Sequence, residues 1–424
     1  MLIAGILLLL LALFGAPLFA VIAAGAMLHF YRADIDLSVV PIEIYRLAEM
    51  PVLLAIPLFT FAGYVLGESG TPTRLVRLTR ALLGWMPGGL AIVALIACAL
   101  FTAFTGASGV TIIALGALLY PALKESGYGD NFSLGLITSS GSLGVLFAPA
   151  LPLILYGVIA QQLGVGKAFT IDQLFLAGIL PGLLMLALLS AWSMWHSRGQ
   201  ALHAFSRAEA LTALREAAWE IPLPFIVLGG IYSGFFAISE AAAVTTLYVI
   251  IVEVFIYREI PLSSLPRVMR ESMVLVGAIL VILGASLAST NALIDAQVPT
   301  RLFAAISEHI TSPLTFLALL NVFLLLLGTM LDIFSALVIM IPLLLPIATG
   351  YHIDPVHLGI IFLANMQIGY FTPPVGMNLF IAGYRFEKPI FTVYRATLPF
   401  FFILLAAVLI ITYWPALSLY LPGR

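Results

Sequence analysis

The feature that most constrains this sequence is an uncharged run from Ala81 to Leu123, with Phe104-Thr105-Gly106-Ala107-Ser108-Gly109 near its middle. A helix rises about 1.5 Å per residue, so roughly 20 residues cross the hydrocarbon core of a bilayer. The run is therefore too long for one span. It holds either two full spans or a hairpin that enters the membrane and returns.

The residues in the middle of this run are poorly suited to a turn that is exposed to water. It contains no charged residue and no Pro, Asn or Asp of the kind that ordinary surface loops use. Non-helical backbone at membrane depth survives only where it is buried in protein or lines a wet cavity. We therefore expect residues 81–123 to form a re-entrant hairpin, with its tip at Thr105 to Gly109.

Composition places the whole chain in the membrane. Of its 424 residues 62% are hydrophobic and 9% are charged, whereas soluble domains carry about 25% charged residues. The fold class expected is an all-α polytopic membrane protein. A net charge of −2 without a basic block gives no reason to expect a nucleic-acid partner. The lone Cys98 excludes a disulfide framework and a cysteine metal site.

Apolar runs mark the expected spans. Met1 to Phe30 is broken at Gly15-Ala16-Pro17 and is either one kinked span or two short helices. Arg74, Arg77 and Arg80 predict an amphipathic helix on the membrane face. The other expected spans are 50–66, 131–166, 173–195, 221–239, 241–252, 272–293 and 355–384, with a second uncharged pair at 313–331 and 333–351 around Asp332.

The positive-inside rule supports two hairpins that enter from opposite faces. With the arginines at 74–80 in the cytoplasm, two re-entrant hairpins leave all three basic clusters that follow on that same side. These are Arg198 with Arg207, Arg258 with Arg267 and Arg270, and Arg385 with Lys388 and Arg395. Four full spans would also satisfy the rule, but they would expose both uncharged tips to water.

The two halves of the chain repeat one pattern. Leu143-Gly144 to Pro149 corresponds to Ile368-Gly369 to Pro374, at an offset of 369 − 144 = 225. Thr105-Gly106 and Gly328-Thr329, taken as the hairpin tips, have nearly the same separation. Inverted repeats with paired broken helices are typical of secondary transporters, whose sites lie at the midplane.

The breaks carry the candidate chemistry. Proline frees a backbone carbonyl and glycine permits unwound backbone, and such oxygens suit a hard monovalent cation. Half-helix N-termini suit a carboxylate. The neutral side chains beside the breaks are candidate substrate contacts or interhelical hydrogen bonds. They are Ser139, Ser140, Ser142, Asn365, Gln367 and Asn378.

Asp332 is the single residue that most strongly indicates a functional role, because placing a carboxylate inside an apolar run of this length costs free energy. It could bind a cation, carry a proton or cap the helix that follows it. Gly106-Ala107-Ser108-Gly109 also matches an intramembrane serine hydrolase pattern, which would need a histidine near Ser108. All six histidines lie near segment ends, where we expect interfacial positions.

Five motifs together resemble the large membrane subunit of tripartite ATP-independent periplasmic (TRAP) transporters. They cover the chain from about residue 50 to its end, in the family's order. They are Ile56 to Gly63, Thr105 to Gly109, Gly230 to Ala243, Met330-Leu331-Asp332 and Thr372 to Gly376.

The resemblance implies an inverted-repeat, elevator-type, sodium-driven importer without an organic cofactor. It also implies two protein partners, a small four-helix membrane subunit and a periplasmic substrate-binding protein. By motif it assigns one sodium site to Thr105, Ala107, Gly144, Phe147 and Pro149. It assigns the other to Asp332, Gly369, Thr372 and Pro374. Ala107 departs from the family's commoner serine, so Ser108 is expected to supply the missing hydroxyl, and Ser335 stands where many members have another residue.

The expected function is import of a small organic acid by a multi-pass subunit of the bacterial inner membrane. A standalone sodium–dicarboxylate symporter of the same fold class is the alternative. The transport domain would hold residues 81–166 and 313–384, each with one hairpin and one broken helix. The scaffold would hold residues 1–80, 167–312 and 385–424.

Overall fold

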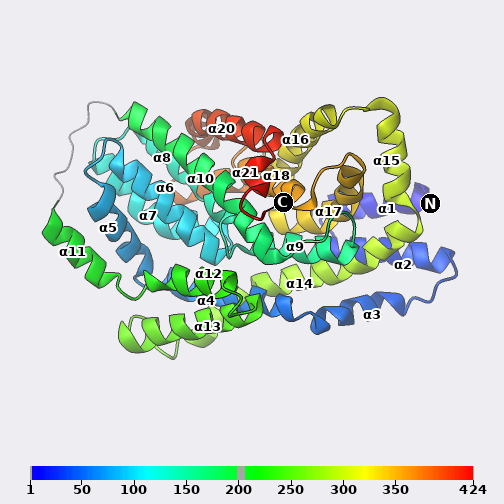
Figure 1. The fold of residues 1–424 in the computed structure, drawn as a ribbon, viewed down its shortest axis with the longest axis horizontal. Coiled ribbons are helices and arrows are strands. Elements are labelled where there is room, and N and C mark those ends of the chain that lie inside the picture. The colour runs from blue at the N-terminus through cyan, green and yellow to red at the C-terminus, as the bar shows by residue number, and fades with distance from the viewer. Residues whose placement is uncertain (1, 198–205, 424) are drawn as a thin grey trace.

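The computed structural model describes residues 2–197 and 206–423, which form helices joined by short loops and contain no strand (Figure 1). The bounds are α1 Leu2–Leu13, α2 Leu18–Arg32, α3 Val39–Arg46, α4 Ala55–Glu68, α5 Thr71–Leu83, α6 Gly89–Thr105, α7 Ser108–Glu125, α8 Asp130–Ser140, α9 Leu151–Leu163, α10 Ile171–His196, α11 Arg207–Glu216, α12 Pro222–Tyr232, α13 Ile238–Ile250, α14 Leu265–Asp295, α15 Val298–His309, α16 Pro313–Met330, α17 Ile333–Gly350, α18 Pro355–Gly369, α19 Met377–Arg385, α20 Ile390–Tyr413 and α21 Ala416–Leu419.

Short irregular helices join several of these elements. Leu47–Glu49, Pro51–Leu54 and Leu143–Leu146 are 3₁₀ turns, and Ile251–Ile256 is a π-helical extension of α13. Seven helical segments are long and apolar enough to cross a membrane, by length and composition. A further pair, Asp130–Leu146 with Leu151–Leu163, is bent by 41° at the first break. The expected polytopic helical architecture therefore holds across the described chain.

The order of elements repeats along the chain. The series α4 to α10 is followed by the series α14 to α20. Each contains, in order, an apolar helix, a short amphipathic helix, a two-helix hairpin, a broken helix and a final span. The second helix of each hairpin has the same length, since α7 and α17 both contain 18 residues. Each break also contains one cis proline bond, Ala148-Pro149 in the first and Pro373-Pro374 in the second.

The hairpin tips correct one detail of the sequence comparison. The first tip is Gly106-Ala107, as expected, but the second is Leu331-Asp332. Gly328 and Thr329 lie inside α16, because Gly328 packs against Gly369 and the helix continues for another half turn. Ala107 and Asp332 therefore occupy the same place in the two repeats.

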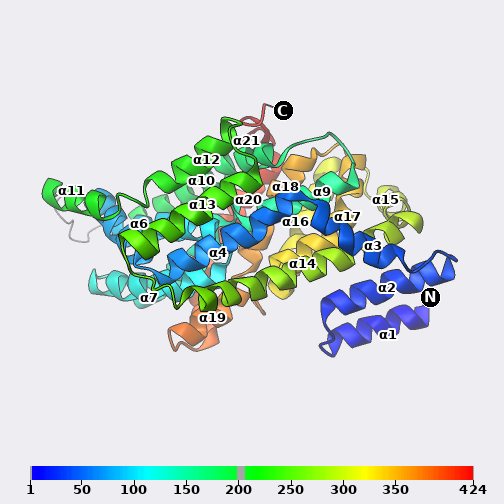
Figure 2. The same ribbon diagram turned by 90° about the horizontal axis from the view of Figure 1, so that it is seen from below.

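The N-terminal segment forms two helices, α1 and α2, which settles the question that the sequence left open. They lie side by side at one edge of the molecule, and α2 packs on α14 (Figure 2). Figure 2 also shows α4, α13 and α14 running beside one another. Arg198, expected in a basic cluster, lies outside the described residues.

Candidate functional site

The first hairpin tip is enclosed by protein rather than exposed as a turn. Thr105 and Ser108 are buried, and Gly106 ends α6 with a left-handed φ of 67°. The first break lies directly against α6. A Cβ atom at Gly144 would sit 2.3 Å from the Ala99 carbonyl oxygen, and the Thr102 hydroxyl donates to the Gly141 carbonyl at 2.8 Å. The first break therefore packs against the last two turns of α6, next to the tip, and we call this contact region the first tip–break junction.

The second tip meets the second break in the same way. A Cβ atom at Gly369 would lie 2.6 Å from the Gly328 backbone, and the Gly376 amide donates to the Thr329 carbonyl at 3.0 Å. The amide of Ile333 donates to the Tyr370 hydroxyl at 2.8 Å. The two junctions differ at their outer ends, because Pro149 is buried whereas Thr372 is half-buried and Pro374 is exposed.

Asp332 caps α17. Its Oδ1 atom accepts hydrogen bonds from the amides of Phe334 and Ser335, both at 3.0 Å, and its Oδ2 atom accepts one from the Ser335 hydroxyl at 2.5 Å. Of the three roles that the sequence allowed, the cap is confirmed. The carboxylate keeps spare lone pairs, so the cap leaves room for a cation.

Several hydrogen bonds join the halves of the site, among them one from the Asn378 side-chain nitrogen to the Thr138 carbonyl at 3.4 Å. The Ser108 hydroxyl, at the first tip, donates to the Asn378 side-chain oxygen at 2.8 Å. The Ser142 hydroxyl, at the first break, donates to the Gln367 carbonyl at 3.1 Å. Ser142 and Gln367 are 225 residues apart, which is the offset of the repeat. The two breaks therefore meet at equivalent positions, and both junctions belong to one packed unit.

Several buried oxygens in this unit have no hydrogen-bond partner in the described structure. They are Oγ1 of Thr105, Oδ1 of Asn365 and Oε1 of Gln367. Buried polar atoms in folded proteins are almost always satisfied, so each orphan needs an explanation. A hard cation binds neutral and charged oxygens. The oxygen atoms of this unit therefore suit coordination of a small cation such as sodium, or a hydrogen bond from a donor on another molecule.

The remaining candidates differ in how their polar groups are engaged. The hydroxyls of Ser139 and Ser140 donate to carbonyls of their own helix, α8. The Asn365 amide donates to Asn321 at 2.6 Å and to the Ile361 carbonyl. Among the described residues, Gln367 donates to the Met185 sulfur alone, a weak acceptor, at 3.4 Å. Asn378 accepts from Ser108 and donates to the Thr138 carbonyl at 3.4 Å. Gln367 and the Asn365 oxygen thus keep the most capacity for a ligand.

Comparison with known proteins explains this arrangement. A family profile described as "Tripartite ATP-independent periplasmic transporter, DctM component" matches residues 2–417. This chain belongs to that family. A Pseudomonas aeruginosa relative named "C4-dicarboxylate TRAP transporter large permease protein DctM" is 36% identical over 403 residues, which cover 94% of this chain and 93% of the relative.

Other relatives are named for different compounds. An "Isethionate TRAP transporter permease protein DctMQ" from Oleidesulfovibrio alaskensis is 35% identical, and the match covers 96% of this chain and 62% of that protein. An "Ectoine/5-hydroxyectoine TRAP transporter large permease protein UehC" from Ruegeria pomeroyi is 30% identical, over 97% of this chain and 96% of the relative. TRAP large permeases are transporters of the bacterial inner membrane and are not enzymes.

A solved structure shares the fold. The YdaH transporter of Alcanivorax borkumensis superposes on this TRAP permease with a TM-score of 0.63, at 15% sequence identity. The match covers 89% of this chain and 87% of that one. The helical transporter fold expected from the sequence is thereby confirmed.

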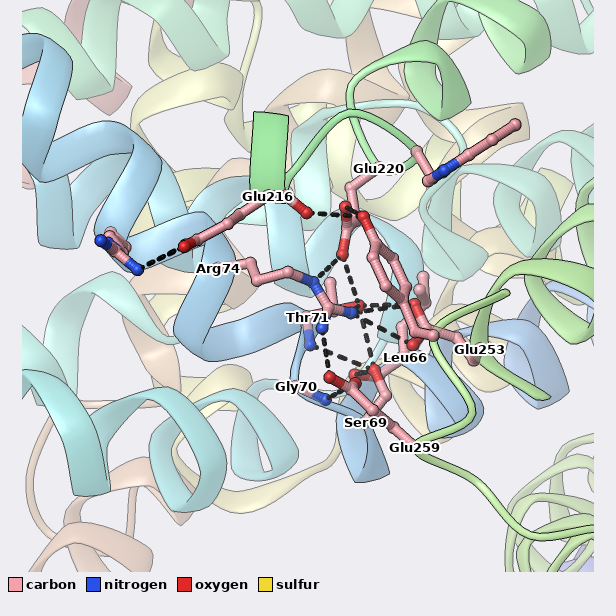
Figure 3. Close-up of polar contacts among 12 residues, drawn as sticks. Leu66, Ser69, Gly70, Thr71, Arg74, Glu216, Glu220, Glu253 and Glu259 are labelled. Carbon is pink, nitrogen blue, oxygen red and sulfur yellow. Dashed lines mark hydrogen bonds and ion pairs between the residues drawn. The ribbon is translucent and has the colours of Figure 1, made fainter. Parts of the chain in front are cut away.

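A buried ionic cluster beside the first hairpin of the permease was missed from the sequence. The Arg74 guanidinium on α5 contacts three carboxylates, those of Glu220, Glu253 and Glu259 (Figure 3). It also lies 3.9 Å from the centre of the Tyr257 ring. Side-chain exposure is 11% for Arg74, 4% for Glu220 and 0% for Glu253. The helix α5, expected to lie on the membrane face, is also anchored to the protein through one of its arginines.

Further contacts satisfy the same cluster. The Thr71 hydroxyl donates to Glu253 at 2.8 Å, and the Tyr257 hydroxyl donates to Glu220 at 2.9 Å. Burial by itself would lower the pKa of Arg74, but the hydrogen bonds that it donates to Glu259 and Glu220 raise its pKa above the usual value. Arg74 therefore stays charged and holds α5 against the α11–α13 region of the permease.

The histidines give a second correction. His357, expected at an interface, is 3% exposed near the start of α18. Its ring nitrogens lie 3.2 Å from the Ser418 hydroxyl and 3.2 Å from the Thr412 carbonyl. The side chain therefore ties α18 to α20 and α21, and position near a helix end does not by itself indicate exposure.

Replacing Ser108 by alanine is expected to cost about 1–2 kcal/mol of stability, because the buried Asn378 oxygen loses its donor. The Ser108 hydroxyl is bound to an amide, not to a base, so we expect the variant to keep measurable uptake. Thermal unfolding in detergent and uptake by proteoliposomes check both points. A variant that lost a proteolytic activity while keeping its stability would instead favour the hydrolase alternative.

Proposed function

We propose that this TRAP permease is a sodium-coupled importer subunit that moves a small organic acid by an elevator mechanism. The substrate class is taken from relatives, whose names specify C4-dicarboxylates, isethionate and ectoine. Each of these compounds carries a carboxylate or a sulfonate group. An oxyanion is therefore the feature that this permease is proposed to recognise.

The repeated tip–break junction carries this proposal. In the first junction the oxygens of Thr105, Ala107, Ser108, Gly144, Phe147 and Pro149 would surround one sodium ion. In the second, those of Asp332, Gly369, Thr372 and Pro374 would surround another. Sodium would supply positive charge where the described site residues include no Lys or Arg. Of the substrate contacts expected from the sequence, Gln367 and Asn378 would each offer the oxyanion one further N–H group. Asn365 already donates through both of its N–H groups, and the hydroxyls of Ser139, Ser140 and Ser142 already donate to carbonyls, so these four would contact the substrate only after exchanging a hydrogen bond.

The packing supports movement of both junctions together. Two hydrogen bonds, Ser108 to Asn378 and Ser142 to Gln367, link the first hairpin tip and first break to the second break, so that these parts form one packed unit. Helices α5 and α15 connect that body to α4 and α14, which would belong to the static scaffold.

We further propose that the permease works with the two partners that the family implies. A small four-helix membrane subunit would extend the scaffold, and a periplasmic binding protein would deliver the substrate. Uptake assays that leave out either partner separate this assembly from a standalone symporter. Undiminished uptake by the permease alone would favour the symporter.

The test of sodium coupling is Asp332→Asn. Asparagine is as good an N-cap as aspartate, so the α17 cap and the fold should survive. Loss of the charge should weaken sodium binding by about 1.5–3 kcal/mol, which is roughly 10- to 100-fold in the sodium concentration for half-maximal uptake. Radiolabelled succinate uptake under sodium gradients of increasing size measures this shift.

Asp332→Ala is the matched control for capping. It should lose about a further 1 kcal/mol of stability, because alanine cannot accept from the Phe334 and Ser335 amides. Wild-type uptake that is indifferent to sodium would overturn the coupling. Sodium dependence unchanged in Asp332→Asn would remove Asp332 from the site.

A further inference from the structure

A polar cavity lies away from the tip–break junctions. Its volume is about 140 Å³, and it is bounded by α3, the end of α9 and the last part of α14. Since one buried water needs roughly 10–15 Å³ on this measure, the cavity has room for a small organic acid. Gln162, in its wall, lies on the same helix as the first break but nearly a helix length away from it.

Arg46 is the cation of this cavity among the described residues that line it. Its Nη1 atom contacts both carboxylate oxygens of Glu43, at 3.0 and 3.2 Å, within the same helix. The guanidinium makes no other hydrogen bond or ion pair within the described chain, so Nε and Nη2 can still donate. The Arg46 side chain is 59% exposed, against 12% for Glu43. A helical ion pair at this spacing is worth about 0.5 kcal/mol, so a ligand can compete for the arginine.

Neutral polar groups complete the wall. Thr290 and Asn291 on α14 make no side-chain hydrogen bond within the described residues, and Gln162 uses only its amide nitrogen, toward the Met50 sulfur. A guanidinium fork pairs with a carboxylate in a bidentate manner, and hydroxyl and amide donors can bind its remaining lone pairs. The wall therefore matches an oxyanion better than it matches a cation or an apolar molecule.

The position of the cavity suits the arrival of substrate from outside the cell. Arg46 and Arg74 lie at opposite ends of the candidate span Pro51–Glu68. If the arginines at 74–80 are cytoplasmic, as the positive-inside rule predicts, Arg46 faces the periplasm. The described residues of the tip–break unit include no Arg or Lys, so an outer arginine would supply a positive charge that the unit itself lacks.

We propose that this cavity is an outer receiving site for the oxyanion group of the transported acid, with Arg46 as its main contact. The site lies between α3 and α14 of the scaffold and α9 of the first broken helix. It would hold the substrate before the substrate reaches the junctions. This inference rests on the proposed function for the identity of its ligand, but its occupancy can be measured without transport.

Cysteine protection tests the site directly. The natural Cys98 is buried, so Ile294→Cys, which lines the cavity and is 51% exposed, would offer the reactive thiol. We expect succinate or isethionate to slow maleimide labelling of the purified full-length variant at least fivefold. Dimethyl succinate, which lacks the charge, should not slow it. Leu314→Cys, which is 62% exposed and outside the cavity wall, is the matched control.

Substitutions in the wall decide the role of the arginine. Adding Arg46→Gln should abolish the protection, and adding Glu43→Gln should strengthen it, because the competing carboxylate is gone. In transport, Arg46→Gln should raise the KM for succinate severalfold without changing sodium dependence. Arg301→Gln, at another exposed arginine, should leave both unchanged.

Failure of the site and failure of the proposed function are distinguishable. Wild-type uptake that ignores sodium would contradict the function, whereas the labelling assay would still report on the cavity. No protection by either anion, equal protection by the diester, or protection that persists in Arg46→Gln would overturn the receiving site.

Discussion

Arg74→Gln is expected to destabilise the permease by about 3–5 kcal/mol, because it leaves buried carboxylates without their partner. Glu253 is fully buried and Glu220 nearly so, and both contact the guanidinium. Glutamine could replace one of these contacts but not the charge. Denaturant or thermal unfolding in detergent measures the loss, and uptake should fall as α5 loosens from the scaffold.

Two controls isolate the buried charge. Arg77→Gln removes an exposed ion pair with Glu216, whose side chains are 47% and 39% exposed, and should cost less than about 1 kcal/mol. Adding Glu253→Gln to Arg74→Gln should recover part of the stability. A protonated carboxyl group needs no cation, so the Arg74→Gln deficit should shrink as the pH falls from about 8 to about 5. Equal losses in the Arg74 and Arg77 variants would contradict a buried anchoring role.

Gly144→Ala is expected to be the most damaging change at the junctions. The new Cβ would lie 2.3 Å from the Ala99 oxygen and 2.4 Å from the Ala103 nitrogen. Both are backbone atoms of a buried helix, so the break must move away from α6. Overpacking of this kind costs about 3 kcal/mol or somewhat more. Separation of the tip from the break should also abolish most sodium-dependent uptake.

Gly277→Ala is the matched control, because its Cβ would meet nothing within 4 Å on α14. Alanine is the better helix former, so this variant should be neutral or up to about 1 kcal/mol more stable. Gly369→Ala should resemble Gly144→Ala, since its Cβ would approach the Gly328 backbone to 2.6 Å. Normal stability and uptake in Gly144→Ala would show that the first junction tolerates separation.

Local chemistry explains why much of the site could be predicted. The glycines and prolines of the breaks, and the uncharged tips, are signals that need no distant partner. Matching the two halves at one offset paired Gly144 with Gly369 and Pro149 with Pro374. The second tip was misplaced by three residues, because the packing that keeps Gly328 helical comes from Gly369 on another helix.

Sequence by itself determined the membrane class, the helices, the internal repeat and the family, because these depend on hydrophobicity, spacing and motif order along the chain. Tertiary structure alone decided which charges and amides meet. Arg74 contacts glutamates that lie 146 to 185 residues later in the sequence. The Ser108 hydroxyl donates a hydrogen bond to Asn378, which lies 270 residues later. Arg46 shares a cavity with residues of α9 and α14. Such meetings depend on how helices pack, and no pattern local to either partner encodes them.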